Sequence, residues 1–147
     1  MKLLFGCDPN AAAMKLSLMA TAEKLGHECV DMGSDDPIYA HTAFRVAEAV
    51  AAGEADRGVL VCGTGLGMTI AANKVKGAYA ALLSDVYSAQ RARLSNNATI
   101  ACMGAFTVGD KLAQELLKTF LSLTFDPECA SAPKVAAYRE YDEKTHN

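Results

Sequence analysis

The residues with the clearest potential for chemistry form one short segment, Cys62-Gly63-Thr64-Gly65-Leu66-Gly67. An apolar run ends at the Cys62 thiol, and a glycine-rich turn then leads into a helical pattern. The N–H groups of such a turn and the positive end of the following helix bind anions and lower the pKa of a nearby thiol. Cys62 is therefore placed to act as a base or nucleophile. The position equally suits the usual role of a free cysteine, a small buried hydrophobe that closes a strand.

The spacing of these glycines excludes two nucleotide-binding motifs. A dinucleotide fingerprint follows the first strand, continues as G-x-G-x-x-G and needs an acidic residue about 20 positions on. A P-loop ends in Gly-Lys-Ser/Thr, and Gly67 is followed instead by Met68-Thr69. The turn therefore predicts an anion site of another kind.

Polar side chains stand at two further places that border predicted strands. Asp8 directly follows the first apolar run and is a candidate ligand for substrate hydroxyls, but it is also a candidate helix N-cap. Ser95, Asn96 and Asn97 precede the last predicted strand. They are candidate site groups, and their composition is also that of an ordinary loop.

The elements that must position these residues follow from alternating short apolar runs and helical patterns. Strands are predicted over residues 2–7, 28–32, 57–62, 78–83 and 98–103. Helices are predicted over residues 11–25, 38–52, 86–94, 109–123 and 132–141, with another from the glycine turn to about residue 74. Repeated strand–helix units predict one three-layer α/β domain over residues 1–147 with a five-stranded parallel sheet. Ligands of such folds bind at the carboxyl ends of the strands.

Composition and charge exclude several classes of protein. The chain has 147 residues, of which 51% are apolar and 21% charged, so it is not a disordered protein. Its net charge of −3 argues against nucleic acid as a partner. No apolar run approaches the roughly 18 residues of a membrane span, and the start is too short and too soon acidic for a signal peptide. We expect a cytoplasmic protein with no membrane partner.

The cysteines and histidines predict neither disulfides nor a metal site. The cysteine count is odd and contains no C-x-x-C pair, which fits free thiols in a reducing compartment. The histidines follow no metal-ligand spacing, so no metal is expected. The residues concerned are Cys7, Cys29, Cys62, Cys102, Cys129, His27, His41 and His146.

The segment V-C-G-T-G-L-G-M-T-I-A-A-N-K-V-K-G, residues 61–77, resembles the signature of the ribose-5-phosphate isomerase B / galactose-6-phosphate isomerase family. The likeness extends to F-G-C-D (5–8), S-D-V-Y-S-A (84–89) and N-N-A (96–98), and so covers nearly the whole chain. The resemblance implies a Rossmann-like domain and a homodimer, tetramer or heteromer with active sites shared at the interface, where the helix over 132–141 is expected. It also implies aldose–ketose isomerisation of a sugar or sugar phosphate through an enediolate, without metal or cofactor.

The resemblance also implies roles for residues of the glycine turn. Cys62 matches the family's base, which moves a proton between C1 and C2 of the sugar. The N–H groups of Gly63, Gly65 and Gly67 would stabilise the enediolate oxygen. Thr64 would orient the base or the substrate.

Further implied site residues come from other parts of the chain. Asp8 would bind substrate hydroxyls, and Asn96 would reach the substrate from a partner chain. Ser95 stands next to Asn96 at the family's ring-opening position, and Lys134 stands in for a final arginine.

Several positions depart from the family pattern. Ribose isomerases of the family have a ring-opening histidine at Ser95, a phosphate-binding arginine at Phe106, a histidine at Pro9 and a tyrosine at Asp36. Their Gly-Gly-Arg-His has no match in residues 125–130. A serine hydroxyl lacks the pKa needed to protonate a ring oxygen near neutral pH, and arginine forks are the usual ligands of phosphate.

Three interpretations of these departures are open. The first is an isomerase of an altered substrate, such as a short or open-chain sugar that needs no ring opening. The second is one subunit of a heteromeric galactose-6-phosphate isomerase whose companion supplies histidine and arginines. The third is a non-catalytic sugar-binding relative, which the intact Cys62 turn disfavours because a pure binder needs no thiol.

Overall fold

Five parallel strands form one sheet in the computed structural model, which describes residues 1–146. The strands are β1 (Lys2–Cys7), β2 (Glu28–Asp31), β3 (Arg57–Cys62), β4 (Ala80–Leu82) and β5 (Ile100–Gly104). Their order across the sheet is β2-β1-β3-β5-β4, and every neighbouring pair is parallel. The predicted five-stranded parallel sheet is confirmed.

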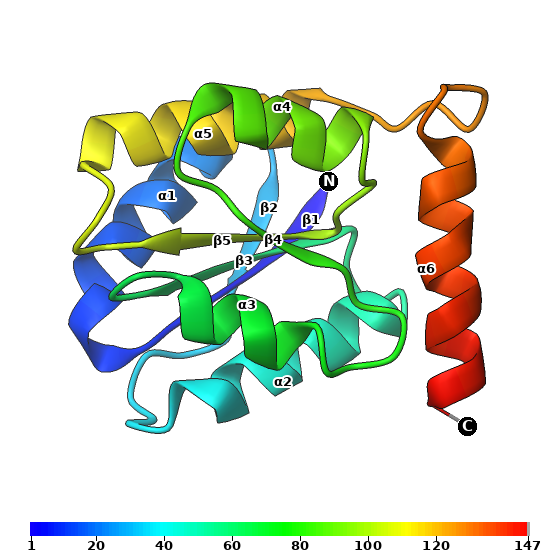
Figure 1. The fold of residues 1–147 in the computed structure, drawn as a ribbon. Helices are drawn as coiled ribbons and strands as arrows, with labels where there is room; N and C mark the ends of the chain where they lie inside the picture. Colours follow the sequence, from blue (N-terminus) through cyan, green and yellow to red (C-terminus); the bar gives the residue numbers. More distant parts are fainter. Residues whose placement is uncertain (147) are drawn as a thin grey trace.

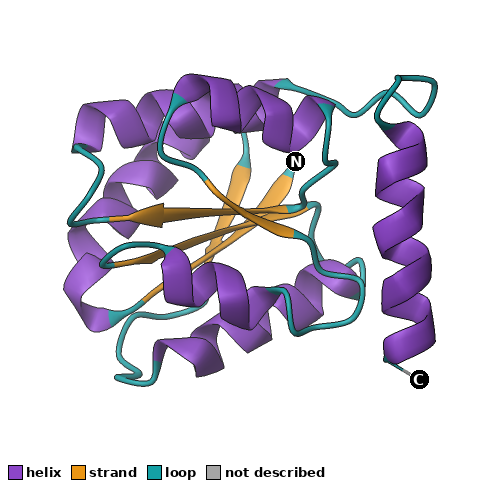
Figure 2. Cartoon of the chain, viewed as in Figure 1, coloured by secondary structure: helices purple, strands orange, loops and turns teal. Residues whose placement is uncertain are grey.

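Helices cover both faces of this sheet and complete three layers (Figures 1 and 2). They are the 3-10 turn η1 (Pro9–Ala11) and the helices α1 (Ala12–Lys24), α2 (Tyr39–Ala51), α3 (Leu66–Ala72), α4 (Val86–Leu94), α5 (Asp110–Ser122) and α6 (Ala132–Thr145). One apolar core lies between the sheet and α1, α4 and α5, and a second lies between the sheet and α2 and α3. The Rossmann-like α/β fold is confirmed. None of the helices within residues 1–146 combines the length and apolar character that crossing a bilayer requires.

The alternation of strand side chains explains the two cores. Leu3, Phe5 and Cys7 of β1 point into the first core, and Leu4 points into the second. All six residues of β3, at the centre of the sheet, are buried. A strand covered on both faces is apolar throughout, which is why its sequence, R-G-V-L-V-C, carries no polar alternation after the first residue.

The register of the sheet brings the ends of three strands together. Cys7 of β1 pairs with Val61 of β3, and Cys62 of β3 pairs with Gly104 of β5. The segments that follow these strands therefore meet at one edge of the sheet, the carboxyl edge.

Helix α6 stands apart from the three layers (red in Figure 1). Val135 is the buried residue of this helix. Asp142 ties the helix to the residues before β4, since its Oδ2 accepts hydrogen bonds from the Gly77 N–H and the Tyr79 hydroxyl, both at 2.8 Å. The predicted helix over 132–141 is present and continues to Thr145. Its place at a dimer interface stays a prediction.

Other boundaries differ from the predicted ones for local reasons. Pro9 and the Asp8 cap begin a 3-10 turn, so α1 starts at Ala12. Strand β4 is the short edge strand, and the Asn73 side chain bonds both the N–H and the carbonyl of Ala80 at its first residue. Strand β3 and helix α4 have the predicted bounds.

Candidate active site

The thiol of Cys62 lies at the end of β3, on the carboxyl edge of the sheet. Its Sγ accepts a hydrogen bond from the Gly65 N–H at 3.1 Å, so the turn folds back over the sulfur. Cys62 keeps 5% of its surface exposed, whereas Cys7 and Cys102 have none. Burial raises the pKa of the Cys7 thiol to about 11 and that of the Cys102 thiol to about 12, so both behave as core residues.

The turn after Cys62 and the end of β5 lie so close together that each needs a glycine, Gly65 in the turn and Gly104 in the strand. Gly65 has a φ of +80°, and a Cβ there would lie 2.9 Å from the backbone carbon of Met103. A Cβ on Gly104 would lie 2.6 Å from the carbonyl carbon of Thr64. Because backbone atoms cannot swing away, these glycines set how closely the two segments approach.

Two of the backbone N–H groups of the turn after Cys62 donate hydrogen bonds within the turn itself. Gly65 donates to the Cys62 sulfur, and Leu66 donates to the Thr64 Oγ1 at 3.3 Å. Thr64 thus shapes the turn with its own hydroxyl. The N–H of Gly67, in the first turn of α3, has no carbonyl partner within that helix. Gly63 and Gly67 are therefore better placed than Gly65 to donate to a ligand.

Asp8 lies beside this turn because β1 and β3 are neighbours. Its N–H donates to the Val61 carbonyl at 3.0 Å. Its Oδ1 accepts from the Asn10 N–H at 2.7 Å, so the predicted capping role is real. Among the described residues, Oδ2 has no hydrogen-bond partner. This second oxygen of Asp8, beside the turn after Cys62, is therefore available to accept a hydrogen bond from a substrate hydroxyl.

Asn96 and Ser95 lie at the other end of the sheet, before β5. The Ser95 Oγ accepts from Arg91 at 3.1 Å, and the Asn96 carbonyl accepts from the Tyr138 hydroxyl of α6. Arg93 donates to the Asn97 Oδ1 at 3.1 Å and secures the loop. One chain therefore does not bring Asn96 or Ser95 to Cys62.

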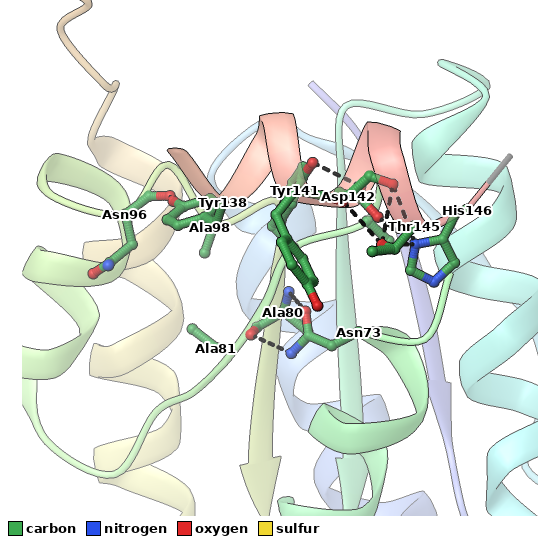
Figure 3. Close-up of a pocket in the computed structure, with 12 residues that line it drawn as sticks. Asn73, Ala80, Ala81, Asn96, Ala98, Tyr138, Tyr141, Asp142, Thr145 and His146 are labelled. Atoms are coloured by element: carbon green, nitrogen blue, oxygen red, sulfur yellow. Dashed lines mark hydrogen bonds and ion pairs between the residues drawn. The ribbon is translucent and has the colours of Figure 1, made fainter. Parts of the chain in front are cut away.

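Lys134 is also remote from Cys62, on the exposed surface of the first turn of α6. Helix α6 packs near the amino ends of β4 and β5, opposite the edge that carries the thiol (Figure 1). Beside α6 lies a cavity of about 500 Å³. Figure 3 shows Asn96 and Tyr138 at one end of it and Asp142 and His146 at the other. The predicted site residues thus form two groups, one at the carboxyl ends of the strands and one near their amino ends.

Two aromatic residues border the glycine turn. The Tyr39 side chain of α2 lies so close to Gly67 that a Cβ there would be 2.0 Å from the Tyr39 hydroxyl oxygen. Phe106, in the turn after β5, lies against Gly63. Tyr39 was not among the residues singled out in the sequence, and its position at the start of a helix gave no signal. Phe106 was noted there as a departure from the family pattern alone.

The sequence and the fold were compared with known proteins. A family model described as Ribose/Galactose Isomerase matches residues 3–137. The chain belongs to this family. A D-erythrulose-4-phosphate isomerase 2 of Mycolicibacterium smegmatis is 54% identical over 117 residues, 80% of this chain and 75% of the relative. The D-erythrulose-4-phosphate isomerase of Pectobacterium atrosepticum is 40% identical over 98% of both chains.

A solved structure of the family has the same fold. The type B ribose 5-phosphate isomerase of Trypanosoma cruzi superposes with a TM-score of 0.92 at 37% identity, covering 99% of this chain and 98% of that one. The predicted recognition and the enzyme class, an aldose–ketose isomerase, are confirmed. The roles of individual residues stay predictions.

Proposed function

We propose that this member of the ribose/galactose isomerase family interconverts the ketose and aldose forms of a short, open-chain sugar phosphate, D-erythrulose 4-phosphate and D-erythrose 4-phosphate. The observation that carries the proposal is Ser95, where the family pattern has a ring-opening histidine. A four-carbon sugar whose O4 is phosphorylated has no hydroxyl left to close a five-membered ring. It needs no ring-opening acid. The 54% and 40% identical relatives bear names that specify this substrate.

In the proposed reaction, the Cys62 thiolate takes a proton from C1 of the ketose and returns it to C2. The electron pair left on C1 forms the enediolate, whose negative charge lies on the oxygen of C2. The N–H groups of Gly63 and Gly67 donate to this oxygen, and the Asp8 carboxylate accepts a hydrogen bond from a hydroxyl of the substrate. The hydroxyl proton moves from O1 to O2, so no net proton is gained or lost.

We propose further that two copies of the chain complete each site. Cys62 and Asp8 lie at the carboxyl edge of the sheet, and Asn96 and Lys134 lie at the opposite end, so a second copy would supply the latter pair. Lys134 would give the phosphate a cationic partner where arginines are missing. The apolar side chains of Leu66 and Ile70 on α3, 55% and 63% exposed, support a covered surface next to the thiol turn.

The test is turnover by the purified chain alone. D-erythrulose 4-phosphate is incubated with the chain in D₂O, and NMR follows aldose formation and deuterium incorporation at C1 and C2. We expect both with this sugar, and much slower conversion of D-ribose 5-phosphate, whose ring must open. No turnover by the single chain, restored by a companion with histidine and arginines, would support the heteromer instead.

A further inference from the structure

Phe106 is the most exposed large apolar side chain described, at 72% of its surface. It follows β5 at the carboxyl edge of the sheet, the edge that carries Cys62. Burying a phenylalanine ring normally contributes a few kcal/mol. A ring left in solvent beside the proposed base therefore contributes little to the packing of this chain's own core.

The backbone beneath this ring is anchored directly to the thiol turn. The Phe106 N–H donates to the Gly63 carbonyl at 2.9 Å, and the Ala105 N–H donates to the Cys62 carbonyl at 2.8 Å. Two residues after Phe106, Val108 is buried and donates to the Gly104 carbonyl at 2.9 Å. The exposure of Phe106 is thus a property of a fixed turn.

The ring itself lies over Gly63, the residue after the thiol. A Cβ on Gly63 would lie 2.8 and 3.0 Å from two carbons of the ring. The ring therefore forms an apolar wall beside the turn whose N–H groups are proposed to hold the enediolate. Such a wall suits the C–H groups of a sugar chain and offers no charge to a phosphate.

We propose that Phe106 is a specificity-determining residue: its ring packs on the carbon chain beside the reacting carbons and gives the phosphate of a longer sugar no cationic partner at this place. The inference rests on the proposed function and adds to it the group that selects chain length. Tyr39, on the Gly67 side, closes the opposite end of the turn.

The experiment measures binding separately from turnover. In the full-length chain carrying Cys62→Ala, which prevents interconversion during the measurement, calorimetry gives the Kd of D-erythrulose 4-phosphate and of D-ribulose 5-phosphate. The same titrations are made with Phe106→Ala and Phe106→Arg added. Leu25→Ala is the matched control, because it shortens another exposed apolar side chain at the far end of α1.

We expect Phe106→Ala to weaken binding of the four-carbon ligand about fivefold, and Phe106→Arg to shift the ratio of the two Kd values at least tenfold toward the five-carbon ligand. Leu25→Ala leaves the ratio unchanged. An unchanged ratio in both Phe106 variants, or no binding of either ligand, overturns the inference. Equal weakening of both ligands together with a smaller oligomer in size-exclusion chromatography assigns the ring to an interface between copies, and also overturns it.

Turnover by the wild-type chain is recorded in parallel. If the wild type does not isomerise either sugar while the binding ratio still shifts, the proposed function fails and the role of Phe106 in selecting the ligand stands. If the wild type turns over and the ratio does not move, only the role of Phe106 fails.

Discussion

Cys62 owes its position to backbone groups rather than to neighbouring side chains. The Gly65 N–H contacts its sulfur, and its carbonyl accepts from Ala105. The sequence predicted the glycine turn because glycine spacing is a local signal. It did not predict that the Gly65 N–H donates to the Cys62 sulfur, since that bond depends on the backbone conformation of the turn.

Replacing Cys62 by alanine tests the assignment of the base. Loss of a general base lowers turnover by about 100- to 10,000-fold, and we expect Cys62→Ala to fall in this range while its circular dichroism matches the wild type. Retention of full activity would contradict the assignment.

Asp8 allows its two roles to be separated. Asparagine keeps an oxygen for the Asn10 N–H, so Asp8→Asn is expected to keep wild-type stability, whereas Asp8→Ala loses about 1 kcal/mol. Both variants should raise KM if the carboxylate binds substrate. Urea unfolding and steady-state kinetics measure the two effects, and an unchanged KM in both variants leaves capping as the whole role.

Gly104 tests whether the approach of the two turns matters. In Gly104→Ala the new methyl meets the Thr64 backbone, so we expect a loss of about 1–3 kcal/mol and a fall in kcat/KM of at least tenfold. Gly109→Ala is the control, since nothing lies within 4 Å of its Cβ and its φ is −68°. Equal behaviour of the two variants would refute this packing argument.

Among the elements, α6 shows what sequence patterns convey and what they omit. Its helical character was predictable, but the contact that docks it was not, because Asp142 meets Gly77 and Tyr79 from 65 and 63 residues away. The same holds for the strands. The β-branched run of β3 predicted its bounds, whereas β4 is shorter than predicted because it lies at the edge of the sheet.

The docking of α6 is expected to depend on pH at both extremes. Burial favours the neutral form of Asp142, but the hydrogen bonds from Gly77 and Tyr79 outweigh it and hold the pKa of this carboxyl below its usual 3.8. Burial and the bond to Asp142 raise the pKa of Tyr79 from 10.0 to about 12. The stabilisation of α6 docking by ionised Asp142 is fully present above pH 3.8 and is lost as pH falls through the lowered pKa. The stabilisation by neutral Tyr79 is fully present below pH 10 and is lost as pH rises toward 12.

Hydrogen exchange resolved by mass spectrometry measures this docking. The protection factor of α6, which is the intrinsic exchange rate at each pH divided by the measured rate, should fall at both pH extremes, while that of β3 stays high. Tyr79→Phe keeps the ring and removes the hydroxyl, so α6 should exchange faster already at pH 7. Unchanged α6 exchange in this variant would show that the hydroxyl contact contributes nothing.

For the whole molecule, the separation of Cys62 from Asn96 is the property that the sequence left open. Family likeness led us to expect a shared site, and the fold of one chain leaves the two groups apart. Which surface of a second copy meets which edge is a property of the assembly, and it follows from no local pattern.

Mixing two inactive variants tests the shared site. Cys62→Ala and Asn96→Ala are each expected to be nearly inactive as homodimers. After unfolding and refolding together, half of the dimers are mixed and contain one intact site, so roughly a quarter of wild-type activity should return. No recovery, with exchange of subunits verified by native mass spectrometry, would contradict a site completed by Asn96 of a second copy.

The two backbone bonds that join the Phe106 turn to the Cys62 turn have a practical consequence. Because the main chain at position 106 is held whatever side chain it bears, amino acids can be exchanged there without displacing the sulfur. A saturation library at this single codon would therefore sample new substrate preferences at little risk to the Cys62 turn, which makes the position a natural starting point for engineering isomerases of other sugar phosphates.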